Sequence, residues 1–171
     1  MARSLFFPTL MWNILLGRLL NVREWWSRID DTLYLGALPF PSDVPRLAGL
    51  GVKGVINTCE EYRGPVRAYR SHSIDQLRIP VVDYCSPTRE QLQESLHYIE
   101  RHRAQGSMVY VHCKAGRGRS ATVALCWLVK SQGMTPSDAM KELIKRRRHV
   151  SRNIHRRQAV LEVAGSVPAA R

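Results

Sequence analysis

A chain of 171 residues suits one domain with a continuous core, which argues against a two-domain organisation. Its 26 Lys and Arg exceed its 14 Asp and Glu, and the formal net charge of +12 favours an anionic partner or substrate: a phosphate, a nucleic acid or an acidic membrane surface. The 4 cysteines are too few for a disulfide framework and show neither a C-x-x-C pair nor the His/Cys spacing of a zinc site. These features indicate a reducing compartment, and neither a metal nor a cofactor is expected.

Residues 1–23 differ in composition from the rest of the chain, because they contain three arginines, no acidic residue and many large apolar side chains. Their apolar run is interrupted by Pro8 and by polar residues, and it falls short of the roughly 20 residues that a spanning helix needs. Such a basic segment is typical of a mitochondrial presequence or a membrane-contact helix, and Trp12, Trp25 and Trp26 suit a membrane interface. An additional helix packed on the core is the alternative.

Strand and helix signals alternate through the remainder of the chain. Extended apolar runs predict strands at 31–38, 52–59, 77–84 and 107–113, and we expect the second and third of these to be buried. A short helix is expected at 42–50. The pattern is typical of strands that alternate with covering helices.

Two longer helices have clear start signals. Thr88 and Gln91 form a capping box, and Thr135 followed by Pro136 is typical of a helix N-terminus. The run at 121–129 is apolar on all sides, as in a central buried helix. Together with the strands, these signals predict an α/β fold: a single domain with a central, mainly parallel sheet flanked by helices. We therefore divide the chain into a targeting or membrane-contact segment at 1–23, a domain at 24–165 and a tail at 166–171.

The stretch VHCKAGRGRS, residues 111–120, places a cysteine between a predicted strand and a predicted helix. Backbone N–H groups of such a loop can converge on one anion, aided by the positive end of the helix macrodipole, and Gly116 and Gly118 permit the tight turn. Cations and helix N-termini lower a thiol pKa from about 8.5 to between about 3.5 and 7.5, which would make Cys113 a nucleophile. The expected anion-binding residues are Lys114, Ala115, Gly116, Arg117, Gly118 and Arg119.

Arg119 can hold two oxygens of a phosphoryl group with its planar guanidinium while the bond to sulfur forms. The pattern Cys113-x5-Arg119, with His112 before it and Ser120 after it, resembles the signature of the cysteine-dependent protein tyrosine phosphatase superfamily. The resemblance implies a dual-specificity phosphatase-like fold and a thiophosphate on Cys113. It also implies phosphate binding by Arg119 and assistance from Ser120 when the phosphate leaves.

A general acid is implied by the same resemblance, on a loop about thirty residues before the cysteine, where Asp83 stands. Asp83 follows the apolar run IPVV, so we expect it at the end of a strand, where a loop can bring it over the anion site. The alternative is that Asp83 caps a turn before Pro87.

The EEY triplet, Glu60 to Tyr62, resembles a pocket-side loop of these phosphatases in which a glutamate, Glu60 or Glu61, orients Arg119. Tyr62 would also supply the aromatic wall that a phosphotyrosine pocket needs. These three residues are therefore expected to support the site without taking part in the chemistry.

Cys59 ends the predicted strand at 52–59, and parallel strands place their carboxyl ends at the same edge of a sheet. Its position resembles that of the resolving cysteine that some lipid phosphatases of this superfamily keep beside the nucleophile. We therefore expect mild peroxide to form a Cys59–Cys113 disulfide. A small core residue is the alternative.

With Lys114 and Arg117, the loop that follows Cys113 resembles the C-K-A-G-[KR]-x-R pattern of lipid phosphatases. Two added cations suit a substrate with more negative charge than one phosphotyrosine, although ordinary surface charges are the alternative. Further segments between residues 25 and 163 resemble the mitochondrial phosphatases that dephosphorylate phosphatidylglycerophosphate. The resemblance implies hydrolysis of the terminal phosphate monoester to phosphatidylglycerol, in the cardiolipin pathway, at the mitochondrial inner membrane.

Other functions stay open on the sequence alone. A phosphoinositide phosphatase, a dual-specificity or tyrosine protein phosphatase and an RNA phosphatase would share this scaffold. A phosphate-binding adaptor is the least favoured, since every expected catalytic residue is present. Those residues are Cys113, Arg119, Ser120 and Asp83.

The stretch at 141–158 carries 8 of the 26 Lys and Arg. It would hold the enzyme on an anionic bilayer, with about 1 kcal/mol for each cation near the surface, or it would form a solvated helix face. Aromatic stacking residues are missing there, so no nucleic-acid partner is expected. The expected partners are an anionic phospholipid substrate and an anionic membrane surface, and the oligomeric state stays open.

Overall fold

The centre of the protein is one five-stranded sheet in which most neighbours run parallel. The computed structural model describes residues 24–166. Its strands are β1 (Trp26–Arg28), β2 (Leu33–Gly36), β3 (Val52–Cys59), β4 (Asp75–Val81) and β5 (Met108–His112). They follow the order β1-β2-β5-β3-β4, and β1 alone of these five is antiparallel to its neighbour.

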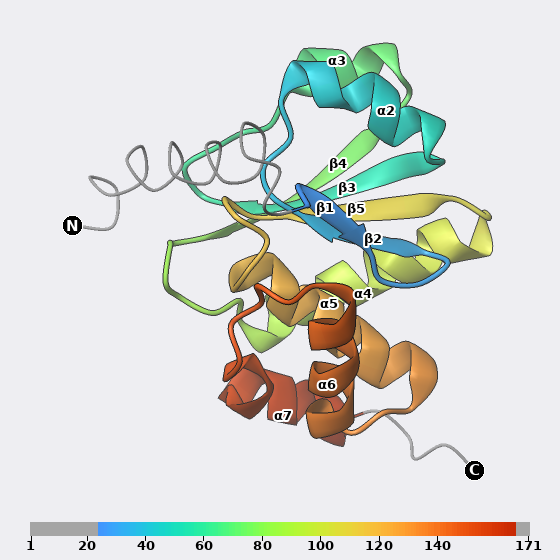
Figure 1. Ribbon diagram of the computed structural model, residues 1–171. Coiled ribbons are helices and arrows are strands. Elements are labelled where there is room, and N and C mark those ends of the chain that lie inside the picture. Colours follow the sequence, from blue (N-terminus) through green and yellow to red (C-terminus); the bar gives the residue numbers. More distant parts are fainter. Residues whose placement is uncertain (1–23, 167–171) are drawn as a thin grey trace.

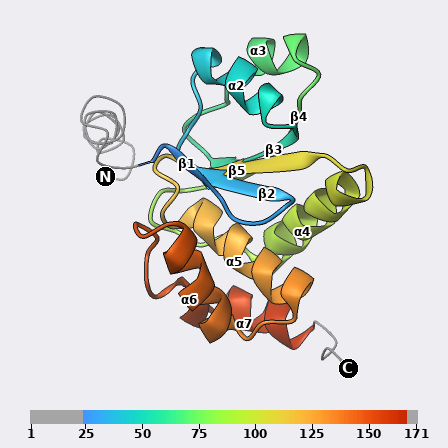
Figure 2. The same cartoon turned by 45° about the vertical axis from the view of Figure 1, so that its right-hand side comes forward.

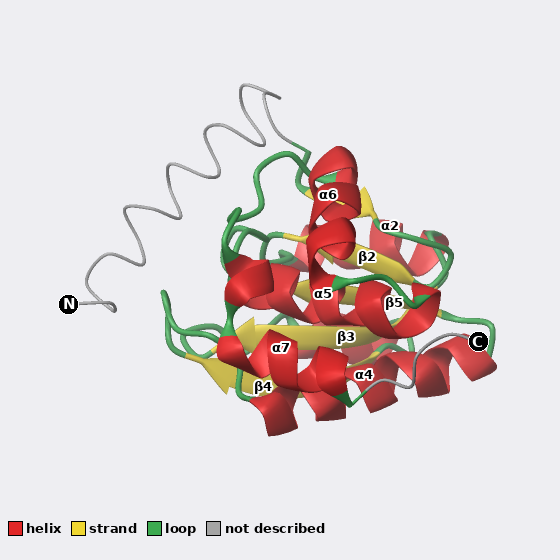
Figure 3. Cartoon of the chain, turned by 90° about the horizontal axis from the view of Figure 1, so that it is seen from below, coloured by secondary structure: helices red, strands yellow, loops and turns green. Residues whose placement is uncertain are grey.

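Helices cover both faces of the sheet (Figures 1 and 2). One face carries α2 (Val44–Gly49) and α3 (Val66–Ser71). The other face carries α4 (Arg89–Ala104), α5 (Arg119–Gln132), α6 (Pro136–Arg146) and α7 (Gln158–Gly165), the layer that is nearer in Figure 3. Short 3-10 turns, η2 (Pro41–Asp43) and η3 (Ile154–Arg156), complete the described elements. The predicted α/β fold class is confirmed.

The carboxyl ends of the parallel strands lie at one edge of the sheet. The loops that follow β3, β4 and β5 therefore meet at that edge, where open α/β sheets bind their ligands. This topology brings residues 59–62, Asp83 and Cys113 together although they are far apart along the chain.

The core lies mainly between the sheet and α5. Every residue of α5 from Arg119 to Val129 is buried, so the all-round apolar run is confirmed as a central helix. The largest of these side chains, Trp127, also donates its indole N–H to Asp30 Oδ2 at 2.6 Å, which satisfies its polar atom near the core edge. Two buried strands, β3 and β5, pack beside this helix.

The predicted strand at 77–84 differs from the structure in position and in burial. β4 spans Asp75–Val81, and only Ile79 and Val81 of its residues are buried, with Arg78 and Pro80 exposed before and between them. The expectation of a fully buried strand was wrong because β4 is an edge strand with β3 as its one neighbour. Asp83 consequently lies in the loop beyond the strand.

Trp25 and Trp26, which the sequence suggested for a membrane interface, are half-buried and make contacts within the domain. Trp25 donates its indole N–H to the carbonyl of Leu38 at 3.0 Å, and its ring lies 6.0 Å from that of Phe40. Trp26 belongs to β1 and packs edge-on against Tyr110 at 6.1 Å. Their aromatic surface is used within the domain, whereas Trp12 and the rest of the 1–23 segment lie outside the described residues.

The N-cap of α4 offers a test of the local structure. The Thr88 hydroxyl accepts the N–H of Gln91 at 3.3 Å, as the capping box predicted. Thr88→Ala should lower the free energy of unfolding by about 1 kcal/mol, because it leaves that N–H without its intramolecular partner. Urea denaturation of this variant beside Thr88→Ser measures the effect, and an equal loss in both variants would contradict the capping role.

Candidate active site

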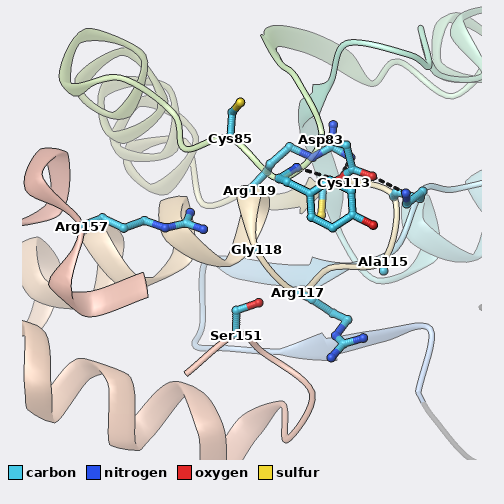
Figure 4. A pocket seen from close by; sticks show the side chains of 11 residues that line it. Asp83, Cys85, Cys113, Ala115, Arg117, Gly118, Arg119, Ser151 and Arg157 are labelled. Atoms are coloured by element: carbon cyan, nitrogen blue, oxygen red, sulfur yellow. Dashed lines mark hydrogen bonds and ion pairs between the residues drawn. The ribbon is translucent and has the colours of Figure 1, made fainter. Parts of the chain in front are cut away.

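The loop between β5 and α5 holds Cys113 at its centre (Figure 4). The Gly116 N–H and the Ser120 hydroxyl each donate a hydrogen bond to Cys113 Sγ at 3.2 Å. The helix that begins at Arg119 directs its N-terminal end toward the loop, so its macrodipole favours negative charge there. The structure places these groups together, as the sequence predicted.

The Cys113 thiol is strongly perturbed by its surroundings. Burial raises its pKa, but the Arg119 guanidinium and hydrogen bonds from Ser120 outweigh burial and lower the pKa from 9.0 to about 7. Where such partners are missing, burial dominates: it raises the pKa of Cys126 from 9.0 to about 12. Near neutral pH a large fraction of Cys113 is therefore thiolate.

Arg147 supports the loop from behind, a role that the sequence did not reveal. Its buried guanidinium donates from Nε to the carbonyl of Gly116 at 3.1 Å and from Nη2 to the carbonyl of Ala115 at 3.2 Å. In a trans peptide the N–H points away from the C=O, so anchoring these carbonyls outside the loop turns the N–H groups of Gly116 and Arg117 toward its interior. Arg147 thus orients the donors of the anion site.

Gly116 is required by both conformation and space. Its φ of +67° lies in the left-handed region, and a Cβ there would come within 2.6 Å of the carbonyl carbon of Gly36. The backbones of β2 and of the loop can approach each other closely because Gly116 lacks a side chain. The predicted need for glycine is confirmed at Gly116, whereas Gly118 has a φ of −117° and a Cβ there would meet no atom closer than 3.9 Å, so that position does not require glycine.

Arg119 is fixed by carboxylates and a backbone carbonyl. Its Nη1 donates to Glu61 Oε2 at 2.9 Å and to the Val81 carbonyl at 2.8 Å, and its Nη2 forms an ion pair with Asp83 Oδ1 at 3.1 Å. Burial lowers the pKa of Arg119, but the Cys113 thiolate and these carboxylates raise it above its ordinary value. The glutamate that holds Arg119 is Glu61, whereas Glu60 contributes a backbone carbonyl that accepts from Arg78 at 3.4 Å.

Asp83 lies over the anion site, as expected for a residue of the loop after β4. Its Oδ2 accepts from Lys114 Nζ, and its other oxygen pairs with Arg119. The turn-capping alternative is also present in part, since Asp83 Oδ1 accepts the N–H of Tyr84 at 3.2 Å. The Asp83 carboxylate therefore occupies the two cations that a bound phosphate would need.

His112 is buried directly before the nucleophile. Burial lowers its pKa from 6.5 to about 3, so the imidazole is neutral at physiological pH. Its backbone carbonyl accepts the Thr58 hydroxyl at 2.8 Å, which ties the end of β5 to β3. His112 thus supports the position of Cys113 through packing and backbone contacts.

A pocket of about 370 Å³ opens above the loop (Figure 4). Lys114 lies in it as a buried side chain, whereas Arg117 is exposed at its rim and donates from Nε to the His149 carbonyl at 2.9 Å. Of the two added cations, Lys114 therefore faces the interior and Arg117 belongs to the rim. The lining residues are Asp83, Tyr84, Cys85, Cys113, Lys114, Ala115, Arg117, Gly118, Arg119, Ser151 and Arg157.

The aromatic side chain of the pocket is Tyr84 and not Tyr62. Tyr62 donates its hydroxyl to the Pro39 carbonyl at 2.7 Å, and it packs edge-on against His112 at 6.3 Å. Tyr84 is 72 % exposed, and its ring lies 5.8 Å from Lys114 Nζ. The predicted aromatic wall is thus supplied from the loop after β4.

Three pocket or loop contacts come from the basic stretch at 141–158. Arg147 anchors the loop, and Ser151 and Arg157 line the pocket. The sequence showed only a run of cations, with no spacing that separates a buried arginine from an exposed one. The alternative of a solvated helix face is therefore wrong for Arg147, which is buried, whereas Ser151 is exposed and Arg157 is half-buried.

Cys59 and Cys113 are both free thiols in the structure. Burial raises the pKa of Cys59 well above 9.0, and the negative charge of Cys113 raises it further, which places the two groups in one electrostatic environment. The disulfide between them stays a prediction.

The fold and the site define a class of protein. The dual specificity phosphatase catalytic domain matches residues 33–164, and the chain belongs to this family of cysteine-dependent phosphatases. The predicted superfamily and enzyme class are confirmed. Within residues 24–166, no helix has both the length and the apolar character needed to cross a bilayer.

Individual relatives show which members of this family the chain is similar to. The chain is 46% identical to phosphatidylglycerophosphate phosphatase PTPMT1 of Arabidopsis thaliana over 81% of its own length and 42% of that protein. It is 37% identical to phosphatidylglycerophosphatase and protein-tyrosine phosphatase 1 of Mus musculus, over 88% of this chain and 83% of that protein. Among solved structures, the protein chain in the crystal structure of PTPMT1 in complex with PI(5)P is 30% identical in sequence to this chain. The two match with a TM-score of 0.74 over 83% of this chain and 98% of the PTPMT1 chain.

The perturbed thiol gives a pH-dependent prediction. In a Cys85→Ser background, alkylation of Cys113 by iodoacetamide should rise with pH around a midpoint near 7. Ser120→Ala removes a hydroxyl that stabilises the thiolate, so the pKa should rise and the midpoint should move to higher pH.

Mass spectrometry of the Cys113 peptide measures the alkylation rate at each pH. Ser131→Ala, at the other end of α5, is the matched control and should leave the midpoint in place. An unchanged midpoint in Ser120→Ala would show that its hydroxyl does not stabilise the thiolate.

Proposed function

We propose that the protein hydrolyses the terminal phosphate monoester of phosphatidylglycerophosphate to give phosphatidylglycerol, a step of the cardiolipin pathway. The observation that carries the proposal is the likeness, over most of the chain, to proteins named for this activity. The pocket agrees with such a substrate, because its cations exceed what one phosphate monoester needs. These cations are Lys114, Arg117, Arg119 and Arg157.

The first chemical step in this proposal transfers the phosphoryl group to Cys113. The thiolate attacks phosphorus, and Arg119 and the inward N–H groups of the loop bind the phosphoryl oxygens as charge develops on them. The bond to the glycerol oxygen breaks, and Asp83 supplies the proton that this alkoxide needs. A thiophosphate and free phosphatidylglycerol result.

In this proposal Asp83 pairs with cations in the free protein and acts as the general acid once substrate is bound. In the free protein its carboxylate pairs with Lys114 and Arg119, and the phosphate dianion would compete for both cations. A carboxyl displaced from its counter-charges by the phosphate is free to turn toward the leaving oxygen, where a general acid acts. Substrate binding would thus prepare the acid.

Hydrolysis of the thiophosphate completes the cycle. Water attacks phosphorus, and Asp83, now a carboxylate, accepts its proton. The Cys113 thiolate leaves, and the Ser120 hydroxyl, 3.2 Å from Sγ, stabilises the returning negative charge. The same hydrogen bond that lowers the thiol pKa therefore assists both steps.

An anionic membrane surface, that of the mitochondrial inner membrane, is the proposed location of this reaction. Support comes from a second, shallow pocket of about 260 Å³ with a basic lining, formed around the end of α6. Its exposed cations include Lys145, Arg146 and Arg148. Cations near a bilayer of acidic lipids contribute about 1 kcal/mol each. The proposed targeting role of residues 1–23 concerns a segment outside the described residues.

The substrate is tested by parallel turnover assays on phosphatidylglycerophosphate, phosphatidylinositol 5-phosphate, a phosphotyrosine peptide and a 5′-triphosphate RNA. The highest kcat/KM should belong to phosphatidylglycerophosphate. Cys113→Ser should abolish turnover of every substrate, because its hydroxyl is not ionised at neutral pH. A higher kcat/KM for another substrate would overturn the assignment, and residual turnover in Cys113→Ser would overturn the mechanism.

The acid role predicts a dependence on the leaving group. Asp83→Asn should slow phosphatidylglycerophosphate hydrolysis by about 10²- to 10⁴-fold, since an alkoxide needs a proton to leave. An activated aryl phosphate leaves without a proton and should lose far less. Phosphate release under saturating substrate measures both rates, and equal losses would argue against Asp83 as the acid.

A further inference from the structure

Arg157 is a pocket cation with an unusual set of partners. Its Nη1 donates to the Thr122 hydroxyl at 2.7 Å and to the Ser86 hydroxyl at 3.4 Å, and both acceptors are neutral. Within residues 24–166 no carboxylate is paired with it, in contrast to Arg119, which has Glu61 and Asp83. The positive charge of Arg157 is therefore held in place without being neutralised.

The guanidinium of Arg157 and a hydroxyl face the same point beside the loop. A Cβ placed on Gly118 would lie 4.0 Å from Arg157 Nη2 and 3.9 Å from Ser151 Oγ, so the space next to Gly118 has two hydrogen-bond donors around it. Ser151 is fixed there, because its N–H donates to the Arg117 carbonyl at 2.8 Å. Figure 4 shows Arg157 reaching toward the loop from the side opposite Asp83.

The guanidinium of Arg157 also interacts electrostatically with Cys113. Burial lowers the pKa of Arg157, and the negative charge of Cys113 raises it. Both residues line the same pocket of about 370 Å³. An anion bound next to Gly118 would thus share one cavity with a phosphate bound at the thiolate.

We propose that Arg157 and Ser151 form a second anion subsite, which binds the diester phosphate of the substrate while the loop binds the terminal monoester. This inference rests on the proposed function, because phosphatidylglycerophosphate carries two phosphates separated by one glycerol unit. Arg157 supplies a planar, permanently charged donor for phosphate oxygens, and Ser151 supplies a hydroxyl. The subsite selects for substrates with a second phosphate near the first.

The test uses two soluble probes, glycerol 1,3-bisphosphate and glycerol 3-phosphate, so that membrane binding does not enter. The wild-type protein should have the higher kcat/KM for the bisphosphate. Arg157→Gln should lower that kcat/KM by about 10- to 100-fold, mainly through KM, which corresponds to loss of a hydrogen bond to a charged group. Turnover of glycerol 3-phosphate should change by less than about 3-fold, since its phosphate is bound by the loop.

Matched variants separate this role from a structural one. Arg156→Gln removes the same charge from the neighbouring exposed residue and should leave both substrates unaffected. Thr122→Val keeps the charge of Arg157 but removes its tether at 2.7 Å, so it should weaken the bisphosphate preference partially. Thermal denaturation of each variant checks that the fold is retained.

Three results would overturn the subsite: no bisphosphate preference in the wild type, equal losses on both probes in Arg157→Gln, or no loss at all. Failure of the proposed function gives a different result. In that case phosphatidylglycerophosphate is not the best lipid substrate, yet the bisphosphate preference and its dependence on Arg157 persist.

Discussion

The hydrogen bonds from Arg147 to two loop carbonyls determine what the site can do. Carbonyl oxygens that pointed inward would repel a phosphate, and holding those of Ala115 and Gly116 outside leaves the interior to N–H groups. One of these N–H groups already stabilises the Cys113 sulfur. The nucleophile and the phosphate share a single set of donors, so the geometry that lowers the thiol pKa is also the geometry that binds substrate.

Two of the pocket cations, Lys114 and Arg119, are paired with internal carboxylates. Asp83 neutralises Lys114 and Arg119 in the free protein, which reduces the cost of holding two buried cations close together. Glu61 stays on Arg119 from the other side and fixes the direction of its guanidinium. In the proposed mechanism Glu61 orients Arg119 and Asp83 exchanges with the substrate, a difference that follows from their positions after β3 and β4.

The sequence predicted the elements with strong local signals. Strand 52–59, the caps at Thr88 and Thr135, the buried helix and the Cys113 loop all depend on near neighbours in the chain, and the structure has them. Arg147 and Arg157 were missed because their roles depend on tertiary contacts about 30 residues or more distant along the chain. The contacts of Trp25 and Trp26 within the domain were missed for the same reason, since their partners belong to other elements.

The strand order has a consequence for how the protein is made. β5, the last strand within residues 24–166, lies between β2 and β3, so the sheet is not continuous until residue 112 has been synthesised. The anchor of the loop follows later still, at Arg147. During synthesis Cys113 therefore passes through a period as an ordinary, weakly nucleophilic thiol. The groups that lower its pKa, Arg119 and Ser120, reach their positions only when the loop and α5 have folded.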